Sequence, residues 1–206
     1  MLQAEQSRTI PFVPSYYDDL DGSFDHAWTM LARGVRDRRS PFHTPTLATI
    51  DADGAPEART IVLRGAMRET ATLRFHTDRR SHKPFQLERD PRCSVHVYDH
   101  AAKIQLRLRG AARLHGQGDV ADTAWTGSKP RSRECYAQTA APGTVLRALD
   151  DLTAGSPLDP DAARGNFTVI LMDVREMEWL YLSHLGHRRA VWTRENDRWT
   201  GTWLAP

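Results

Sequence analysis

Cysteine is scarce in this sequence, and several signatures of large protein classes are missing. Cys93 and Cys135 are its two cysteines; they lie far apart and outside any CxxC pair, which argues against a structural zinc site or a redox disulfide. No apolar run is long enough to span a bilayer. Residues 1–9 are polar and lack the apolar core of a signal peptide. We therefore expect a cytoplasmic protein with no membrane partner.

Charge of one sign is not in excess either. The formal net charge is +2, and basic residues alternate with acidic ones, whereas nucleic-acid-binding proteins usually carry a basic face. Neither GxGxxG nor GxxxxGK occurs, so a Rossmann domain and a P-loop are not expected. His96 and His100 are too few to form a structural zinc site. Nucleic acid and metal are thus not expected as partners.

The remaining composition is that of an ordinary globular domain. The chain has 206 residues, of which 40% are hydrophobic and 26% charged, and this length suits one domain spanning residues 1–206. Apolar residues at helical spacing predict a helix over 24–35, capped by Ser23 or Asp25, within an N-terminal helical extension of residues 1–40.

Strand patterns dominate the rest of the chain. The Asp-Gly turn at 51–54 predicts a hairpin between strands 46–50 and 58–63. Further strands are expected at 72–76, 93–98, 104–109, 167–173, 178–182, 189–193 and 199–203, and short helices at 81–87, 120–125 and 133–138. Residues 149–164, rich in Asp, Pro, Gly and Ala, are expected to form a loop. The fold class is therefore mainly β with peripheral helices, and closing the antiparallel sheet into a barrel would remove its exposed edges.

Basic and hydroxyl groups gather where two of these strands end. The segments are Arg59-Thr-Ile-Val-Leu-Arg64, Arg74-Phe-His-Thr77 and Ser81-His-Lys83, the last at the expected start of a helix. Guanidinium groups, an ammonium group and helix N-terminal amides all favour concentrated negative charge. These segments therefore predict a phosphate site.

Together with residues near the end of the chain, these segments resemble the pyridoxamine 5′-phosphate oxidase family. The further matches are Gln105 before Gly110 and the ending Trp179…His187-Arg-Arg189…Trp199…Leu204-Ala-Pro206. The resemblance covers about residues 45–206. It implies an antiparallel split β-barrel that binds flavin mononucleotide (FMN) and forms a homodimer with flavin sites at the interface.

The resemblance also implies roles for individual residues. Arg59 and Lys83 match the residues that grip the FMN phosphate, and Gln105 matches a glutamine whose side-chain amide meets the flavin ring. Trp179 and Arg189 would reach the flavin from the partner subunit. The full implied cofactor-binding set is Arg59, Thr60, Ile61, Val62, Leu63, Arg64, His76, Thr77, Ser81, His82, Lys83, Gln105, Trp179 and Arg189.

The substrate side departs from the family pattern. Arg64, Trp125, Lys129 and Arg133 stand where the family has lysine, tyrosine, arginine and serine, and His82 replaces a phosphate-supporting arginine. Leu185-Gly-His187 stands where the oxidases have Arg-x-His, so the histidine is kept and the arginine is absent. The implied substrate-binding residues are Arg64, Lys129, Arg133 and His187, with His187 as the candidate catalytic residue. A small phosphorylated or acidic substrate is expected.

Alternatives stay open for several residues and for the function. Lys83 could be a helix-surface lysine, Trp179 a core residue and His187 a structural histidine, and Arg189 could pair with Glu195. The first functional hypothesis is an FMN-dependent oxidoreductase in which hydride passes between a small substrate and flavin N5. The alternatives are a true pyridoxine/pyridoxamine 5′-phosphate oxidase and a non-catalytic flavin- or heme-binding protein.

Overall fold

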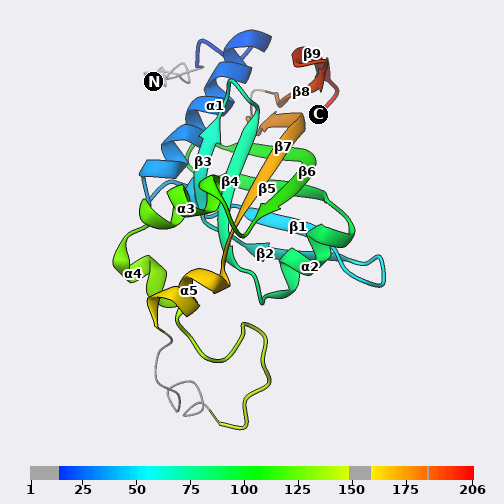
Figure 1. Cartoon of the computed structure of the whole chain (residues 1–206). Helices are drawn as coiled ribbons and strands as arrows, with labels where there is room; N and C mark the ends of the chain where they lie inside the picture. The colour runs from blue at the N-terminus through cyan, green and yellow to red at the C-terminus, as the bar shows by residue number, and fades with distance from the viewer. Residues whose placement is uncertain (1–13, 149–158, 185) are drawn as a thin grey trace, which may run out of the picture.

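One nine-stranded antiparallel sheet forms the body of the molecule in the computed structural model, which describes residues 14–148, 159–184 and 186–206 (Figure 1). The strands are β1 (Thr46–Ile50), β2 (Pro56–Thr60), β3 (Leu63–Met67), β4 (Thr72–Asp78), β5 (Arg92–Asp99), β6 (Ile104–His115), β7 (Phe167–Tyr181), β8 (Arg188–Glu195) and β9 (Arg198–Leu204). The helices are α1 (Leu20–Arg36), α2 (His82–Arg89), α3 (Asp119–Thr126), α4 (Pro130–Arg133) and α5 (Pro160–Asn166), with 3-10 turns at Pro41–His43 and Glu134–Tyr136.

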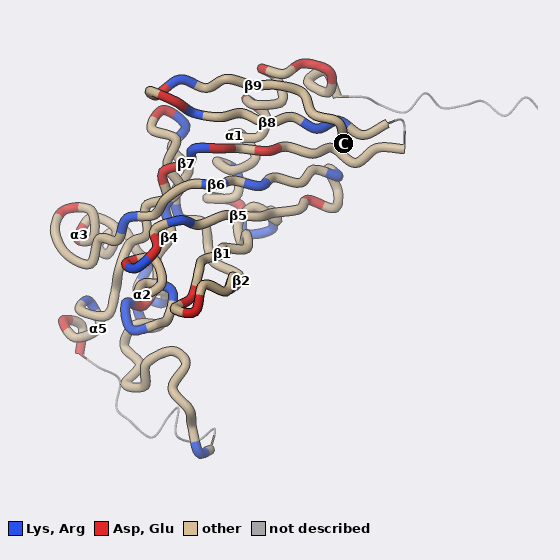
Figure 2. The backbone as a smooth tube through the Cα atoms, turned by 90° about the vertical axis from the view of Figure 1, so that its right-hand side faces the viewer, with Lys and Arg blue, Asp and Glu red and all other residues tan. Residues whose placement is uncertain are grey.

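The long strand β7 divides the sheet into two branches. Its first half, from Phe167 to Asp173, pairs with β4, and its second half, from Glu176 to Tyr181, pairs with β8. The main path runs β2-β1-β5-β6-β7-β4-β3, while β8 and β9 extend from β7 on the other branch (Figure 2). Among the described residues the sheet does not close on itself, as expected for the predicted split barrel.

The two faces of the sheet differ in burial, because successive side chains of a strand point to opposite sides. One side carries the core: Leu47, Val95, Leu106, Met177 and Trp179 are fully buried there. Helix α1 packs into this same core through Phe24, Trp28 and Leu31.

The opposite side of the sheet is called here the open face. One register row across five strands defines it, and its members are Ala48, Ser94, Arg109, Glu176 and Thr193. None of the five is buried.

Several predicted boundaries were wrong. Helix α1 begins at Leu20 and is capped by Asp19, whose carboxylate accepts from the Asp21 amide; neither Ser23 nor Asp25 is the cap. The predicted strand over 58–63 is divided between β2 and β3. The two strands predicted over 167–173 and 178–182 are one strand, β7.

The predicted loop over 149–164 was also partly wrong. Residues 160–164 belong to α5, which begins with Pro160 after the N-cap Asp159. Residues 149–158 of that prediction lie outside the described part of the chain. Across residues 14–148, 159–184 and 186–206, no helix is both long and apolar enough to cross a membrane.

Candidate functional site

The predicted phosphate site is assembled around Lys83. Strand β4 ends at Asp78, and a short turn leads to Ser81, the N-cap residue of α2. The Lys83 ammonium donates to the Thr77 and Ser81 hydroxyls, each at 3.0 Å. The Ser81 hydroxyl donates to the Asp78 carbonyl at 2.7 Å, so it does not cap the helix amides. The structure therefore brings three predicted site residues together.

Arg59 lies close to this cluster and is held by neighbours on three elements. Its Nη1 donates to the buried Thr49 hydroxyl on β1, and its Nη2 donates to Gln86 Oε1 on α2 at 3.1 Å. Its Nη2 also lies 3.1 Å from the carboxylate of Glu57 on β2. The guanidinium is thus fixed in place, with a side-chain exposure of 18%.

The electrostatics of Lys83 support an anion site. Burial, followed by the charge of Arg59, lowers the pKa of Lys83, and the carboxylates of Asp78 and Glu57 raise it by less. Two cations held near each other with two hydroxyls would be stabilised by a phosphate dianion. The donor set therefore fits the FMN phosphate group.

Arg64 and His76 form a second group. The side chain of Arg74 donates to the Arg64 carbonyl at 3.1 Å. Burial, then the charges of Arg74 and Arg64, lower the pKa of His76 to about 4. The His76 ring packs edge-on against Phe167, with centroids 4.9 Å apart, and its Nε2 is buried with no hydrogen-bond partner. His76 is consequently a neutral imidazole at pH 7.

An aromatic cluster joins this second group to the predicted substrate residues. Tyr136 and Trp125 both pack on Phe167, and burial raises the pKa of Tyr136 to about 12, against a smaller lowering by Arg64. Arg133 lies over the Trp125 ring at 5.2 Å and donates to the Thr126 carbonyl. His76 and Arg133 are therefore connected through the rings of Phe167 and Trp125.

Gln105 and Arg189 belong to one register row of the open face. Gln105 on β6 lies opposite Leu180 on β7, which lies opposite Arg189 on β8. Gln105 Oε1 contacts His96 Nε2 at 3.1 Å. Arg189 donates to the carboxylate of Glu178 at 3.0 Å, so the suggested pairing with Glu195 was wrong.

His187 lies beside Arg189, since both line a cavity of about 340 Å³ together with Asp18 and the C-terminal Trp203, Leu204 and Pro206. The Ser183 amide donates to His187 Nδ1 at 3.1 Å. A neutral His187 therefore carries its proton on Nε2, which makes Nε2 a hydrogen-bond donor. Trp179 is fully buried and stacks on Tyr181, so the structure favours the core alternative for its side chain.

The remaining predicted residues are more scattered. Thr60 is exposed at the end of β2, Ile61 and Leu63 are buried, and Val62 lies between β2 and β3. His82 is exposed at the start of α2, and Lys129 is exposed before α4. Leu185 lies outside the described residues.

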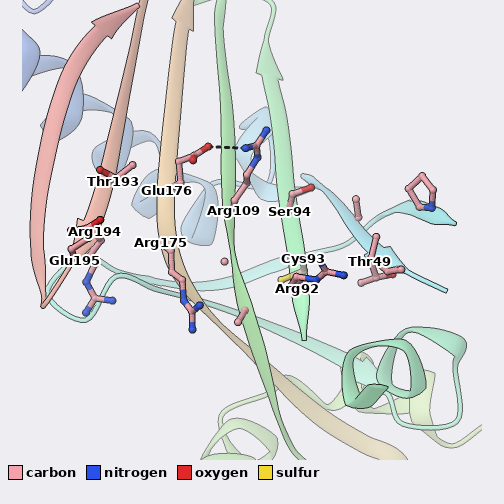
Figure 3. A pocket seen from close by; sticks show the side chains of 15 residues that line it. Thr49, Arg92, Cys93, Ser94, Arg109, Arg175, Glu176, Thr193, Arg194 and Glu195 are labelled. Carbon is pink, nitrogen blue, oxygen red and sulfur yellow. Dashed lines mark ion pairs between the residues drawn. The ribbon is translucent and has the colours of Figure 1, made fainter. Parts of the chain in front are cut away.

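A further cavity, of about 700 Å³, lies on the open face and contains none of the predicted site residues (Figure 3). Ala48, Ile50, Cys93 and Ala111 contribute to its apolar lining, while arginines such as Arg109, which pairs with Glu176, contribute its charges. Arg92, Arg175 and Arg194 of the lining pair with carboxylates outside it, on Asp90, Asp173 and Asp197.

Sequence reasoning missed the residues that hold the predicted ones. Thr49, Gln86 and Glu57 surround Arg59, and Glu178 holds Arg189. Glu57 and Arg59 are two apart on a strand, a spacing that places both side chains on one side and was an available signal. Gln86 and Glu178 gave no such signal, because their contacts depend on the tertiary fold.

Comparison with known proteins agrees with this geometry. Residues 25–116 match the family described as pyridoxamine 5′-phosphate oxidase, FMN-binding domain. A pyridoxine/pyridoxamine 5′-phosphate oxidase of Thermobifida fusca is 36% identical over 110 residues, which are 53% of this chain and 47% of that protein. One from Roseobacter denitrificans is 24% identical over 196 residues, which are 90% of this chain and 95% of that protein.

Solved structures share the fold. A pyridoxamine 5′-phosphate oxidase-related, FMN-binding protein of Nostoc punctiforme has a TM-score of 0.73 at 24% identity, covering 95% of this chain and 100% of that chain. PhzG of Burkholderia lata, solved with tetrahydrophenazine-1-carboxylic acid, has a TM-score of 0.72 at 23% identity, covering 95% and 98%. The matched family domain is an FMN-binding domain, which confirms the expected cofactor at the level of the family. Residues 25–116 of this chain are thus similar to the FMN-binding domain of the pyridoxamine 5′-phosphate oxidase family, and the chain shares the split-barrel fold of FMN-binding proteins related to that family.

Proposed function

We propose that this protein is an FMN-dependent oxidoreductase acting on a small acidic or phosphorylated substrate. The observation that carries the proposal is the cluster of Lys83, Thr77 and Ser81 beside Arg59, within residues 25–116, which match an FMN-binding domain. Arg59 and Lys83 would bind the phosphate group, with the two hydroxyls as further donors. When bound, FMN supplies hydride transfer at N5 of its ring.

The separation of the two predicted flavin-binding groups supports the proposal of a homodimer. Arg59 lies on β2 and Arg189 on β8, and four strands, β1, β5, β6 and β7, lie between them. At about 4.8 Å per strand, this corresponds to roughly 24 Å along the sheet. A second copy of the chain, packed on the open face, would supply one group to a flavin bound by the other. The cavity of about 700 Å³ on this face would then be covered by the partner.

Substrate binding is proposed for Arg64, Lys129, Arg133 and His187. The first three would provide positive charge for an acidic group. Arg133 lies over the Trp125 ring, and Trp125 packs edge-on against Tyr136. His187 would present its Nε2 proton to a substrate oxygen or nitrogen, because Nδ1 already accepts the Ser183 amide. His187 would therefore donate a hydrogen bond to the substrate and orient the substrate relative to the cofactor.

Titration with FMN and with riboflavin tests the cofactor part of this proposal. Arg59→Ala should weaken FMN binding at least tenfold, because it removes a charge-assisted contact to the phosphate. Riboflavin has no phosphate, so its affinity should not change. Equal FMN affinity of the wild-type and Arg59→Ala proteins would contradict the assignment.

A second candidate is a true pyridoxine/pyridoxamine 5′-phosphate oxidase, which is favoured by the names of the Thermobifida and Roseobacter relatives. Anaerobic addition of pyridoxamine 5′-phosphate to the FMN-loaded protein should bleach the flavin if this candidate is right. Leu185→Arg restores the family arginine; if bleaching is absent in both proteins, the missing arginine is not the reason. Reduction by neither this substrate nor NADH nor NADPH would instead favour a non-catalytic flavin-binding protein.

A further inference from the structure

Glu57 places a negative charge inside the phosphate site. It precedes Arg59 by two residues on β2, so the two side chains lie on the same side of the strand. Its Oε1 lies 3.1 Å from Arg59 Nη2, and its Oε2 accepts from Gln86 Nε2. Gln86 in turn accepts from Arg59 Nη2 through Oε1 at 3.1 Å. Glu57, Gln86 and Arg59 therefore form a closed ring of contacts.

This ring limits what the Arg59 guanidinium offers to a phosphate. A guanidinium has two edges that present a parallel pair of N–H groups, and both edges include an Nη2 hydrogen. Nη2 of Arg59 already lies 3.1 Å from both the Glu57 carboxylate and Gln86 Oε1. A bidentate phosphate contact therefore has to displace Glu57 or Gln86. Gln86 is buried, whereas the Glu57 side chain is 46% exposed and can turn toward solvent.

We propose that Glu57 sets the cofactor affinity of this site by competing with the flavin phosphate for Arg59. The inference rests on the proposed function, because it takes Arg59 and Lys83 as the phosphate-binding cations. Displacement of Glu57 costs its ion pair with Arg59, and a phosphate bound nearby also repels the carboxylate. Phosphorylated flavins are thus held less tightly than the two cations alone would hold them, while flavins without a phosphate are unaffected.

The surroundings of Glu57 agree with this competition. Hydrogen bonds from Gln86 and then Arg59 lower the pKa of Glu57, with smaller contributions from the charges of Arg59 and His82, so the carboxylate is ionised at neutral pH. Its charge also raises the pKa of Lys83, so the carboxylate partly offsets the positive charge of both Arg59 and Lys83. Arg59 does not need Glu57 for its orientation, because Thr49 and Gln86 also hold the guanidinium.

Flavin affinities of Glu57→Gln test the proposal in the full chain. The substitution keeps the size and an acceptor for Gln86 but removes the charge. FMN should bind about fivefold more tightly, the size of effect expected for one partly exposed ion pair, and riboflavin should bind as in the wild type. The matched control is Glu88→Gln, which removes one charge from an exposed position of α2 and should leave both affinities unchanged.

The contrary outcomes are distinct. Weaker or unchanged FMN binding by Glu57→Gln would show that Glu57 orients Arg59 or is neutral, and would overturn the competition. An equal gain for riboflavin would overturn it too, because the effect would not depend on the phosphate. If the wild-type protein binds FMN and Arg59→Ala does not, the cofactor part of the proposed function stands whatever the result for Glu57. A wild-type protein that binds neither flavin would contradict the proposed function and this inference together.

Discussion

At the scale of single residues, His76 makes a predicted contribution to the pH dependence of stability. Its pKa is about 4 in the folded protein and near 6.5 in an unfolded chain. Between these values the unfolded state binds more protons, so stability should be complete above pH 6.5 and should fall as the pH decreases toward 4. The free energy of unfolding, measured with urea at several pH values in this range, should change less with pH for His76→Gln than for the wild type. Parallel curves for the two proteins would contradict the assignment.

Glu178 holds Arg189, the residue proposed to contact the flavin, through an ion pair between neighbouring strands. It is 7% exposed and accepts from both Arg107 and Arg189. Burial raises the pKa of Glu178, but the two arginines together outweigh this and lower it.

Removal of this charge should therefore destabilise the protein. Glu178→Gln should lower the free energy of unfolding by about 1–2 kcal/mol, less than for a fully buried pair because both arginines are partly exposed. Glu176→Gln is the control, since its partner Arg109 is largely exposed and such pairs contribute little. Equal stability of Glu178→Gln and the wild type, measured by denaturant unfolding, would show that the carboxylate does not stabilise the arginines.

Individual residues of the candidate phosphate site were predictable, whereas most of the residues that hold them in place were not. Arg59, Thr77, Ser81 and Lys83 lie at strand and helix ends, where local sequence indicates both structure and chemistry. The partner of Arg189 was predicted wrongly, because Glu195 lies on the same strand as Arg189 and Glu178 lies on the neighbouring strand. Cross-strand partners depend on register, which the sequence of one strand does not contain.

At the scale of elements, Gly110 is essential to the pairing of β6 with β7. The register shifts between Arg109 and Gly110, and a Cβ at Gly110 would overlap the Asp173 carbonyl oxygen. Gly110→Ala should therefore cost about 3 kcal/mol of stability, because backbone rather than a flexible side chain has to move.

The control for this prediction is Gly165→Ala. Gly165 lies in α5, and a Cβ there has nothing within 4 Å. Alanine favours a helix over glycine by up to about 1 kcal/mol, so this variant should be equal to or more stable than the wild type. Equal thermal midpoints for Gly110→Ala and the wild type would contradict the close approach of β6 and β7.

Element types were predicted better than element limits. Alternating apolar residues identified β1, β5 and the start of β6, because each strand has one face on the core. The same pattern could not show that β7 is continuous, since this strand is flanked by different partners along its two halves. Nor could it divide β2 from β3, where the chain passes from one end of the sheet path to the other.

At the scale of the whole molecule, the open face should be a dimer interface. Ala48→Glu places a charge within its apolar cavity and should shift the protein from dimer to monomer, with weaker FMN binding because the partner's residues are lost. Thr29→Glu, at an exposed position of α1, which packs on the core side of the sheet, is the control and should remain dimeric. Sedimentation velocity measures the oligomeric state of both variants. A wild-type monomer that binds FMN tightly would contradict the shared site.

The most direct test of the account is the visible absorption spectrum of the purified protein, followed by identification of the released cofactor. The account predicts an oxidised-flavin spectrum, or its appearance on titration with FMN, with one FMN bound per chain and loss of tight uptake in Arg59→Ala. A colourless protein that does not bind added FMN would contradict it, because the split barrel would then have kept its fold and lost its flavin.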